Sequence, residues 1–161
     1  YRQMDFLHLD YESEFDAVLQ SYGEFNTFSD DALAELLSHI RAALKPHGLL
    51  LFDVTTRAHR KRSAASNRWD VTEGGLWKPG LHLVLEEGFD YPDHDVFCNQ
   101  YIVADVDGSS VYRFWFHDYD INAIKEVLEK NGFSLDVIWN DFDGTPFSEG
   151  GDFLAVVARK L

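Results

Sequence analysis

Apolar positions along the chain follow two different periods, and each period predicts one kind of element. Between residues 33 and 44 they recur at spacings of three and four, which predicts an amphipathic helix with its N-cap at Ser29 and its end at Pro46–Gly48. Residues 15–20 and 49–54 are short apolar runs, typical of strands buried in a parallel sheet. The first third therefore predicts a strand–helix–strand unit.

The middle of the chain has a different pattern. Residues 57–68 are polar and basic, which favours a solvated helix or loop. Three runs with rough alternation follow at 81–89, 96–105 and 110–117, and Asp107–Gly108 between the last two is a strong hairpin signal. The pattern predicts an antiparallel insertion of three strands.

The last part returns to helix and strand. An apolar stripe between 121 and 128 predicts a helix capped by Asp118 or Asp120 and stopped by Asn131–Gly132. Further strands are predicted at 133–139 and 153–158, and 2–7 is interpreted as the tail of another. We therefore expect an α/β fold with a mainly parallel sheet.

Length and composition fit one globular domain. The chain has 161 residues, and we predict a single domain over 1–161 with the antiparallel insertion at 81–117 inside it. Hydrophobic residues make up 45% and aromatic residues 15%, which excludes a disordered acidic tail. Fourteen basic against 28 acidic residues give a net charge of −14, so we expect no nucleic-acid partner.

Two further observations concern the environment of the protein. No apolar run approaches the roughly 20 residues that span a bilayer, so no membrane partner is expected. Cys98 is the single cysteine, which excludes an internal disulfide and is compatible with a reducing compartment. We therefore expect a cytoplasmic location.

Four stretches, taken in order, resemble the C-terminal two-thirds of class I S-adenosylmethionine-dependent methyltransferases of the small-molecule type. Glu14–Val18 resembles the fourth strand of that family, and Leu44–Asp53 its L-K-P-G-G turn and fifth strand, with His47 in place of the first glycine. Val127–Phe133 is similar to the helix end before the sixth strand, and Phe153–Lys160 to the seventh. The resemblance implies a partial Rossmann-like sheet with an antiparallel last strand and an antiparallel lid after the fifth family strand.

The resemblance also implies a cofactor, S-adenosylmethionine, with S-adenosylhomocysteine as the product. Asp5 and Phe6 match the acidic and apolar pair that the family places at the adenine. Gln20, Ser21 and Tyr22 match the end of the fourth strand, where the family contacts the methionine portion and the methyl group. The alternatives are a surface Asp beside a core Phe, and an ordinary junction between a strand and a loop.

Acceptor contacts are harder to assign. Glu24 and Asn26 lie in the loop that should face the active centre, and Trp77, Arg113 and His117 lie in or near the insertion that would cover it. Arg113 among aromatic neighbours could clamp an anionic acceptor, or be a solvated residue on a strand face. No side chain is identified as catalytic, no spacing indicates a metal site, and an amine, hydroxyl or carbon acceptor fits equally well.

One departure from the family pattern is large. The Gly-rich cofactor loop and the acidic ribose clamp of the family have no counterpart, because the chain begins around the third family strand. We therefore expect part of a longer polypeptide, with this chain alone binding the cofactor poorly.

The alternative is a non-catalytic binding or dimerisation module that packs an aromatic sheet against a partner. An exposed sheet edge also predicts self-association. The aromatic residues in question are Tyr101, Tyr112, Phe114 and Trp115.

Overall fold

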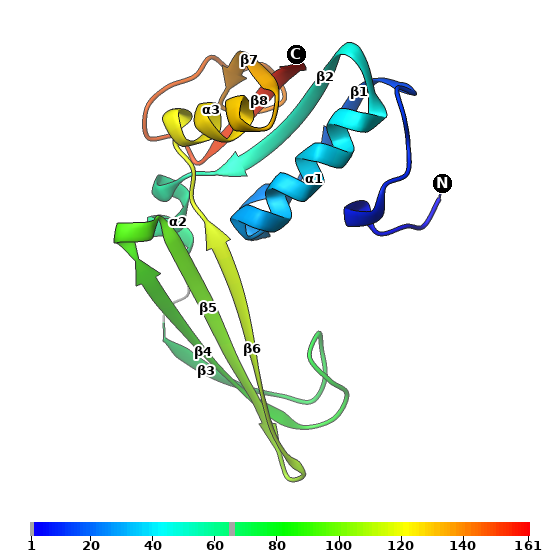
Figure 1. Ribbon diagram of the computed structural model, residues 1–161. Helices are drawn as coiled ribbons and strands as arrows, with labels where there is room; N and C mark the ends of the chain where they lie inside the picture. Colours follow the sequence, from blue (N-terminus) through cyan, green and yellow to red (C-terminus); the bar gives the residue numbers. More distant parts are fainter. Residues whose placement is uncertain (1, 65–66) are drawn as a thin grey trace.

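The computed structural model, which describes residues 2–64 and 67–161, contains two four-stranded sheets (Figure 1). The first sheet has the order β1 (Phe15–Gln20), β2 (Leu44–Thr55), β8 (Phe153–Lys160), β7 (Phe133–Trp139). The second has the order β3 (Arg68–Thr72), β4 (His82–Tyr91), β5 (Val96–Asp105), β6 (Gly108–His117). The helices are α1 (Asp30–Ala43), α2 (Arg57–Ser63) and α3 (Ile121–Lys130), with short 3₁₀ turns η1 (Phe6–His8), η2 (Glu24–Thr27) and η3 (Pro92–His94).

In the first sheet, β1 pairs in parallel with β2, and β8 runs antiparallel to both β2 and β7. This confirms the α/β fold, the strand–helix–strand unit and the antiparallel last strand. One expectation was wrong, because β1 is not buried: it is the edge strand, and Leu19 is 64% exposed. As expected, the sheet is mainly parallel: β8 lies between β2 and β7 and runs antiparallel to both, whereas β1, β2 and β7 run in the same direction.

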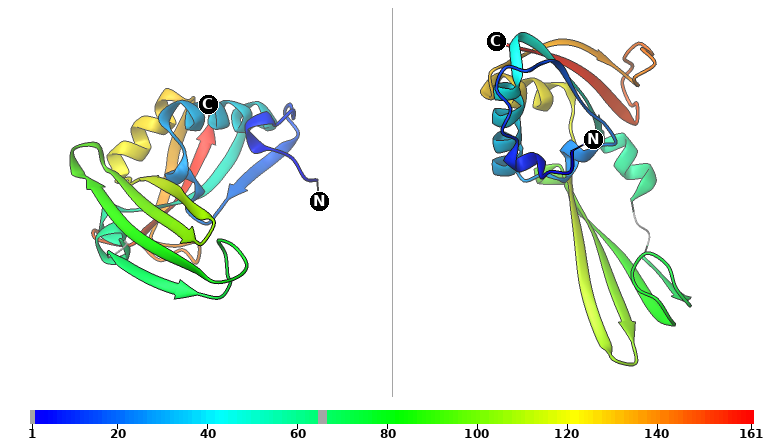
Figure 2. Two further views of the ribbon diagram at one scale, coloured as in Figure 1. Left: turned by 90° about the horizontal axis from the view of Figure 1, so that it is seen from below. Right: turned by 90° about the vertical axis from the view of Figure 1, so that its right-hand side faces the viewer.

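Two helices cover one face of the first sheet, as Figure 2 shows in its right-hand view. The side chain of Ser29 caps α1 by accepting the Ala32 N–H, and the side chain of Asp120 caps α3 by accepting the Ala123 N–H. The predicted stripes of both helices supply the core, together with alternate residues of β2 and β8. This buried set includes Leu33, Leu36, Leu37, Ile40, Leu50, Phe52, Val54, Ile124, Leu128, Leu154 and Val156.

The second sheet extends away from the first, as both figures show. The predicted strands of the insertion are present as β4, β5 and β6, and Asp105 pairs with Gly108 across the predicted hairpin turn. An additional strand, β3, pairs antiparallel with β4. We did not predict it because it is short and mixes charged with apolar residues.

Two local predictions were wrong. Residues 2–7 form no strand; instead the Asp5 carboxylate accepts the Leu7 N–H at 3.0 Å and stabilises η1, a local bond that competes with extended structure. The segment 57–68 is not simply a solvated face, since Arg60 of α2 is only 7% exposed; its residues 65–66 lie outside the described chain. Among the described residues, no helix is long and apolar enough to cross a membrane.

Candidate functional site at the carboxyl edge of the first sheet

The carboxyl ends of β1 and β2 meet at one edge of the first sheet because the two strands are parallel. The loop after β1 is held at this edge by the side chains of Asp53 and Asn26. The Gly23 N–H donates to Asp53 Oδ1 at 3.0 Å, and Gly23 has a φ of 67°, which favours glycine. The loop that follows the predicted cofactor segment is therefore held against the end of β2.

Asn26 belongs to the same loop, and its side-chain amide also holds the loop in place. Its Nδ2 donates to the backbone oxygens of Thr55 and His117, and its Oδ1 accepts the Thr55 N–H at 2.9 Å. The side chain is buried, and these contacts join the loop, the end of β2 and the end of β6. Asn26 was predicted to contact an acceptor, but its amide is fully engaged with the backbone. Its place in the fold is that of a positioning residue.

The predicted methionine contacts lie where β1 ends. Tyr22 is 91% exposed with a φ of 85°, a conformation that is uncommon for a residue with a Cβ atom. Ser21 is exposed beside it. Gln20 Oε1 is buried and, among the described residues, has no hydrogen-bond partner. A buried amide oxygen with no partner is costly, and it fits an edge that holds a polar ligand.

The predicted adenine contacts lie on η1. Phe6 packs edge-on against Phe28, with ring centroids 5.5 Å apart, so η1 touches the far end of the loop that follows β1. The Asp5 carboxylate is more than half exposed and lies 3.2 Å from His8 Nδ1. The Leu7 backbone N–H lowers the pKa of Asp5, so the carboxylate stays ionised and keeps free lone pairs for an amine.

The remaining predicted acceptor residues do not line one pocket. Trp77 packs on Tyr112, with ring centroids 5.1 Å apart, whereas Arg113 Nε donates to Gln100 Oε1 on the opposite face of the same sheet. Glu24 is exposed on η2. His117 lies at the end of β6, with Nδ1 3.9 Å from Asp30 Oδ1. Glu24 and His117 therefore remain at the carboxyl edge, and Trp77 and Arg113 cannot clamp one ligand together.

A cleft of about 500 Å³ lies beside this edge, and the sequence did not reveal it. The first residues of α2 and α3 and the segment before β8 form its walls, and none of the predicted acceptor residues lines it. The residues that line it include Thr56, Arg57, Asp118, Tyr119, Asp120, Phe147, Glu149, Gly151 and Leu154. One signal was available, since Thr56 and Asp118 each directly follow a strand.

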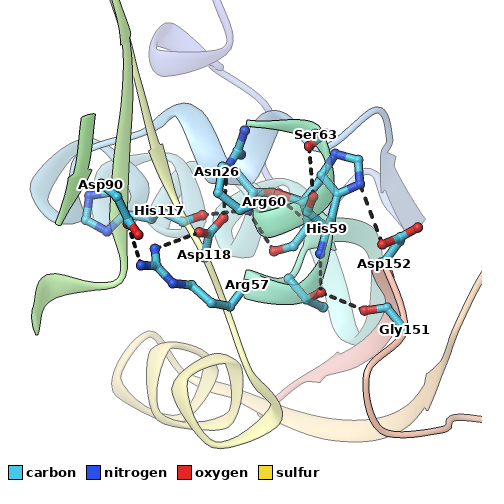
Figure 3. A network of polar contacts seen from close by, with 12 residues as sticks. Asn26, Arg57, His59, Arg60, Ser63, Asp90, His117, Asp118, Gly151 and Asp152 are labelled. Carbon is cyan, nitrogen blue, oxygen red and sulfur yellow. Dashed lines mark hydrogen bonds and ion pairs between the residues drawn. The ribbon is translucent and has the colours of Figure 1, made fainter. Parts of the chain in front are cut away.

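A buried ion-pair network joins this cleft to the second sheet (Figure 3). Asp118 lies 3.3 Å from both Arg57 Nη1 and Arg60 Nε, and Arg57 also pairs with Asp90. The Arg60 guanidinium lies 4.4 Å from the ring centroid of Phe116. Burial raises the pKa of the Asp118 carboxyl, and both arginines oppose that shift.

Burial also raises the pKa of Tyr119, the next residue in the cleft wall, to about 12. Desolvation of the phenolate is the largest cause, and the Asp30 carboxylate adds to it. Among residues 2–64 and 67–161, no group of His, Cys, Asp and Glu side chains converges as metal ligands do. The side chains at this edge offer carboxylates, amides, a histidine, aromatic rings and the Arg57 guanidinium.

Comparison with known proteins gives the fold. No protein-family model and no curated protein matches the sequence. Among solved structures, the CcbJ methyltransferase from Streptomyces caelestis is 18% identical over 98% of this chain, with a TM-score of 0.67. An S-adenosylmethionine-dependent methyltransferase from Clostridium acetobutylicum is 12% identical over 98% of the chain, with a TM-score of 0.66. The sugar N-methyltransferase KedS8 from a Streptoalloteichus species is 17% identical over 98% of the chain, with a TM-score of 0.56.

The match covers nearly all of this chain but only part of the proteins it resembles. The chain spans 62% of the Streptomyces protein, 63% of the Clostridium protein and 61% of KedS8. The chain therefore has the Rossmann-like α/β fold of S-adenosylmethionine-dependent, small-molecule methyltransferases.

Proposed function

We propose that this chain contributes to S-adenosylmethionine-dependent methyl transfer to a small molecule, as part of a longer polypeptide. The observation that carries the proposal is the carboxyl edge of β1. There a Gln20 oxygen without a partner among the described residues and an exposed Tyr22 precede a loop fixed by Asp53 and Asn26. Ligands bind at this edge in open α/β sheets. The match of nearly the whole chain to methyltransferase structures supports the same assignment.

The residues of this edge divide the work of binding. Asp5 accepts a hydrogen bond from the exocyclic amine of the adenine, and the backbone N–H of Phe6 faces the ring. Gln20, Ser21 and Tyr22 hold the methionine portion. When bound, the cofactor supplies an activated methyl group on a sulfonium, so the acceptor needs little acid–base help. Positioning and exclusion of water are then the main tasks of the protein.

For the acceptor, we propose Glu24 and His117 as contacts, because both remain at this edge. Asn26 positions the loop between them. The second sheet acts as the lid over the acceptor. The cleft beside α2 and α3 adjoins this site, since Asp118 in its wall directly follows His117. KedS8 is a sugar N-methyltransferase, and a Burkholderia thailandensis protein among the solved structures methylates 1,6-didemethyltoxoflavin. Both names support a small-molecule acceptor.

Three further features belong to the same proposal. A cytoplasmic location agrees with the single cysteine, Cys98, which is free and buried. The net charge of −14 supports small molecules over nucleic acid as partners. Among the described residues, β1 is an edge strand of the first sheet, and this edge is the reason to expect self-association of this chain when it is expressed alone.

Calorimetric titration with S-adenosylhomocysteine tests the cofactor assignment. The experiment compares this chain with a polypeptide that joins it to an upstream Gly-rich strand–loop–helix, and we expect the longer polypeptide to bind more tightly. Asp5→Ala removes a hydrogen bond to a charged group, worth about 1.5–3 kcal/mol, and should weaken binding at least tenfold. Tyr22→Ala should also weaken it.

The matched control is Asp16→Ala. Asp16 is an exposed carboxylate near the amino end of β1, where it pairs with Lys45. Its removal should leave the affinity unchanged. Affinity that is insensitive to both Asp5→Ala and Tyr22→Ala would contradict the assignment of this edge.

A further inference from the structure

The two faces of the second sheet differ in what packs on them. On the face here called the covered face, Trp77 packs on Tyr101 and Tyr112, and the Arg60 guanidinium lies over Phe116, although Tyr112 stays 42% exposed. The other face, here called the open face, carries a row of apolar cross-strand partners that crosses all four strands. This row consists of Trp69, Leu85, Ile102 and Val111. Trp69 is 69% exposed and Val111 is 50% exposed, so a continuous apolar row faces solvent.

A row with opposite charges at its two ends lies next to the apolar row. Glu87 on β4 is the partner of Gln100 on β5, which is the partner of Arg113 on β6. Both charged side chains are exposed, and among the described residues neither has an ion-pair partner. They are two strand spacings apart, about 10 Å. The open face therefore carries a negative charge on one side of β5 and a positive charge on the other.

We propose that the open face binds the open face of a second copy of this chain in a two-fold symmetric dimer. A two-fold axis along β5 places β4 of each copy over β6 of the other. Glu87 of each copy then faces Arg113 of the other, and Leu85 faces Val111. The charge pattern is thus complementary to that of the symmetry mate, and Leu85, Ile102 and Val111 of the apolar row are removed from water.

The size of the face is adequate for such a contact. Strands β4, β5 and β6 have ten residues each, and β3 has five. The two-fold axis along β5 overlaps β4, β5 and β6 only, and at about 3.4 Å per residue and about 4.8 Å between strands their flat area is roughly 500 Å². Side-chain relief raises the accessible area toward the roughly 800 Å² per partner of a standard interface.

The net charge of −14 opposes association at low salt. At 0.15 M salt the Debye length is about 8 Å, so most of this repulsion is screened while close pairs such as Glu87 and Arg113 persist. The inference is independent of methyl transfer, and it is distinct from pairing along the edge of β1. We therefore expect a dimer at 0.15 M salt.

Charge reversal tests this geometry by sedimentation equilibrium of the 161-residue chain. Glu87→Arg and Arg113→Glu each place like charges opposite one another in a homodimer. Each variant should raise the dimer dissociation constant at least tenfold. An equimolar mixture of the two variants should recover wild-type association, because the heterodimer regains an opposite-charge contact at both positions. The double variant should recover it as well.

Ser110→Glu is the matched control, since it adds a charge at an exposed position of the covered face. It should leave the dissociation constant unchanged. Recovery in the mixture also shows that both variants are folded. A monomeric wild-type chain, equal association of all variants, or failure of the mixture to recover would each overturn the proposal.

Discussion

Replacing Asp118 with Asn tests whether the buried network holds the fold together. Asp118 is the only described acidic partner of Arg60, which lies on α2 with 7% of its surface exposed. Asp118→Asn keeps the shape of the side chain and removes its charge. The Arg60 guanidinium then stays buried beside a neutral acceptor and the rings of Phe97 and Phe116.

The size of the effect follows from these contacts. Removing one partner of a buried ion pair costs about 3–5 kcal/mol. A desolvated cation–π contact with Phe116 retains up to about 2 kcal/mol, so we expect the lower end, about 3 kcal/mol. For a chain of this size, that loss lowers the Tm by about 6–12 °C.

Urea unfolding followed by circular dichroism measures the free energy of unfolding. The matched control is Arg62→Ala, also on α2, which breaks the exposed pair between Arg62 and Asp152 in the segment before β8. That loss should be below about 1 kcal/mol. The double variant Arg60→Met/Asp118→Asn should regain about 2 kcal/mol relative to the sum of the single changes. Equal losses of unfolding free energy in Asp118→Asn and Arg62→Ala would show that the buried pair of Arg60 and Asp118 contributes no more to stability than an exposed pair.

Three more changes have defined outcomes. Asn26→Ala leaves buried backbone groups at Thr55 and His117 without partners and should cost about 3 kcal/mol in urea unfolding, whereas the exposed Asn122→Ala should cost almost nothing. Gly48→Ala brings a Cβ to 3.0 Å from both the Leu44 side chain and the Lys45 oxygen and should cost about 1–3 kcal/mol, whereas Gly74→Ala meets no atom within 4 Å. Tyr119 has a native pKa of about 12, above that of the unfolded chain, so its contribution to stability is complete below pH 10 and lost as the pH rises toward 12. In the Tyr119→Phe variant, the free energy of unfolding should fall less between pH 10 and 12 than in the wild type. An equal fall in both proteins would contradict the raised pKa of Tyr119.

Local patterns predicted the elements but not their partners. The stripes of α1 and α3 and the caps at Ser29 and Asp120 follow from spacing within a few residues, and the structure confirms them. The burial of Arg60 depends on Asp118, which lies 58 positions away, and no local pattern carries that information.

The candidate site shows the same division. The segment at the end of β1 could be located from its strand and from the family resemblance. The cleft could not, because it is formed by the starts of α2 and α3 and the segment before β8. The opposite faces of Tyr112 and Arg113 were predictable, since neighbours in a strand point to opposite sides.

We propose that the end of β1 and the turn η1 form one cofactor site. The most direct measurement is a ¹H–¹⁵N correlation spectrum of the ¹⁵N-labelled chain, titrated with S-adenosylhomocysteine into the millimolar range, where weak binding is still visible. We expect saturable shifts at Asp5, Phe6 and Gln20 to Gly23. An unchanged spectrum, or shifts confined to α3 and to the strands of the second sheet, would contradict it.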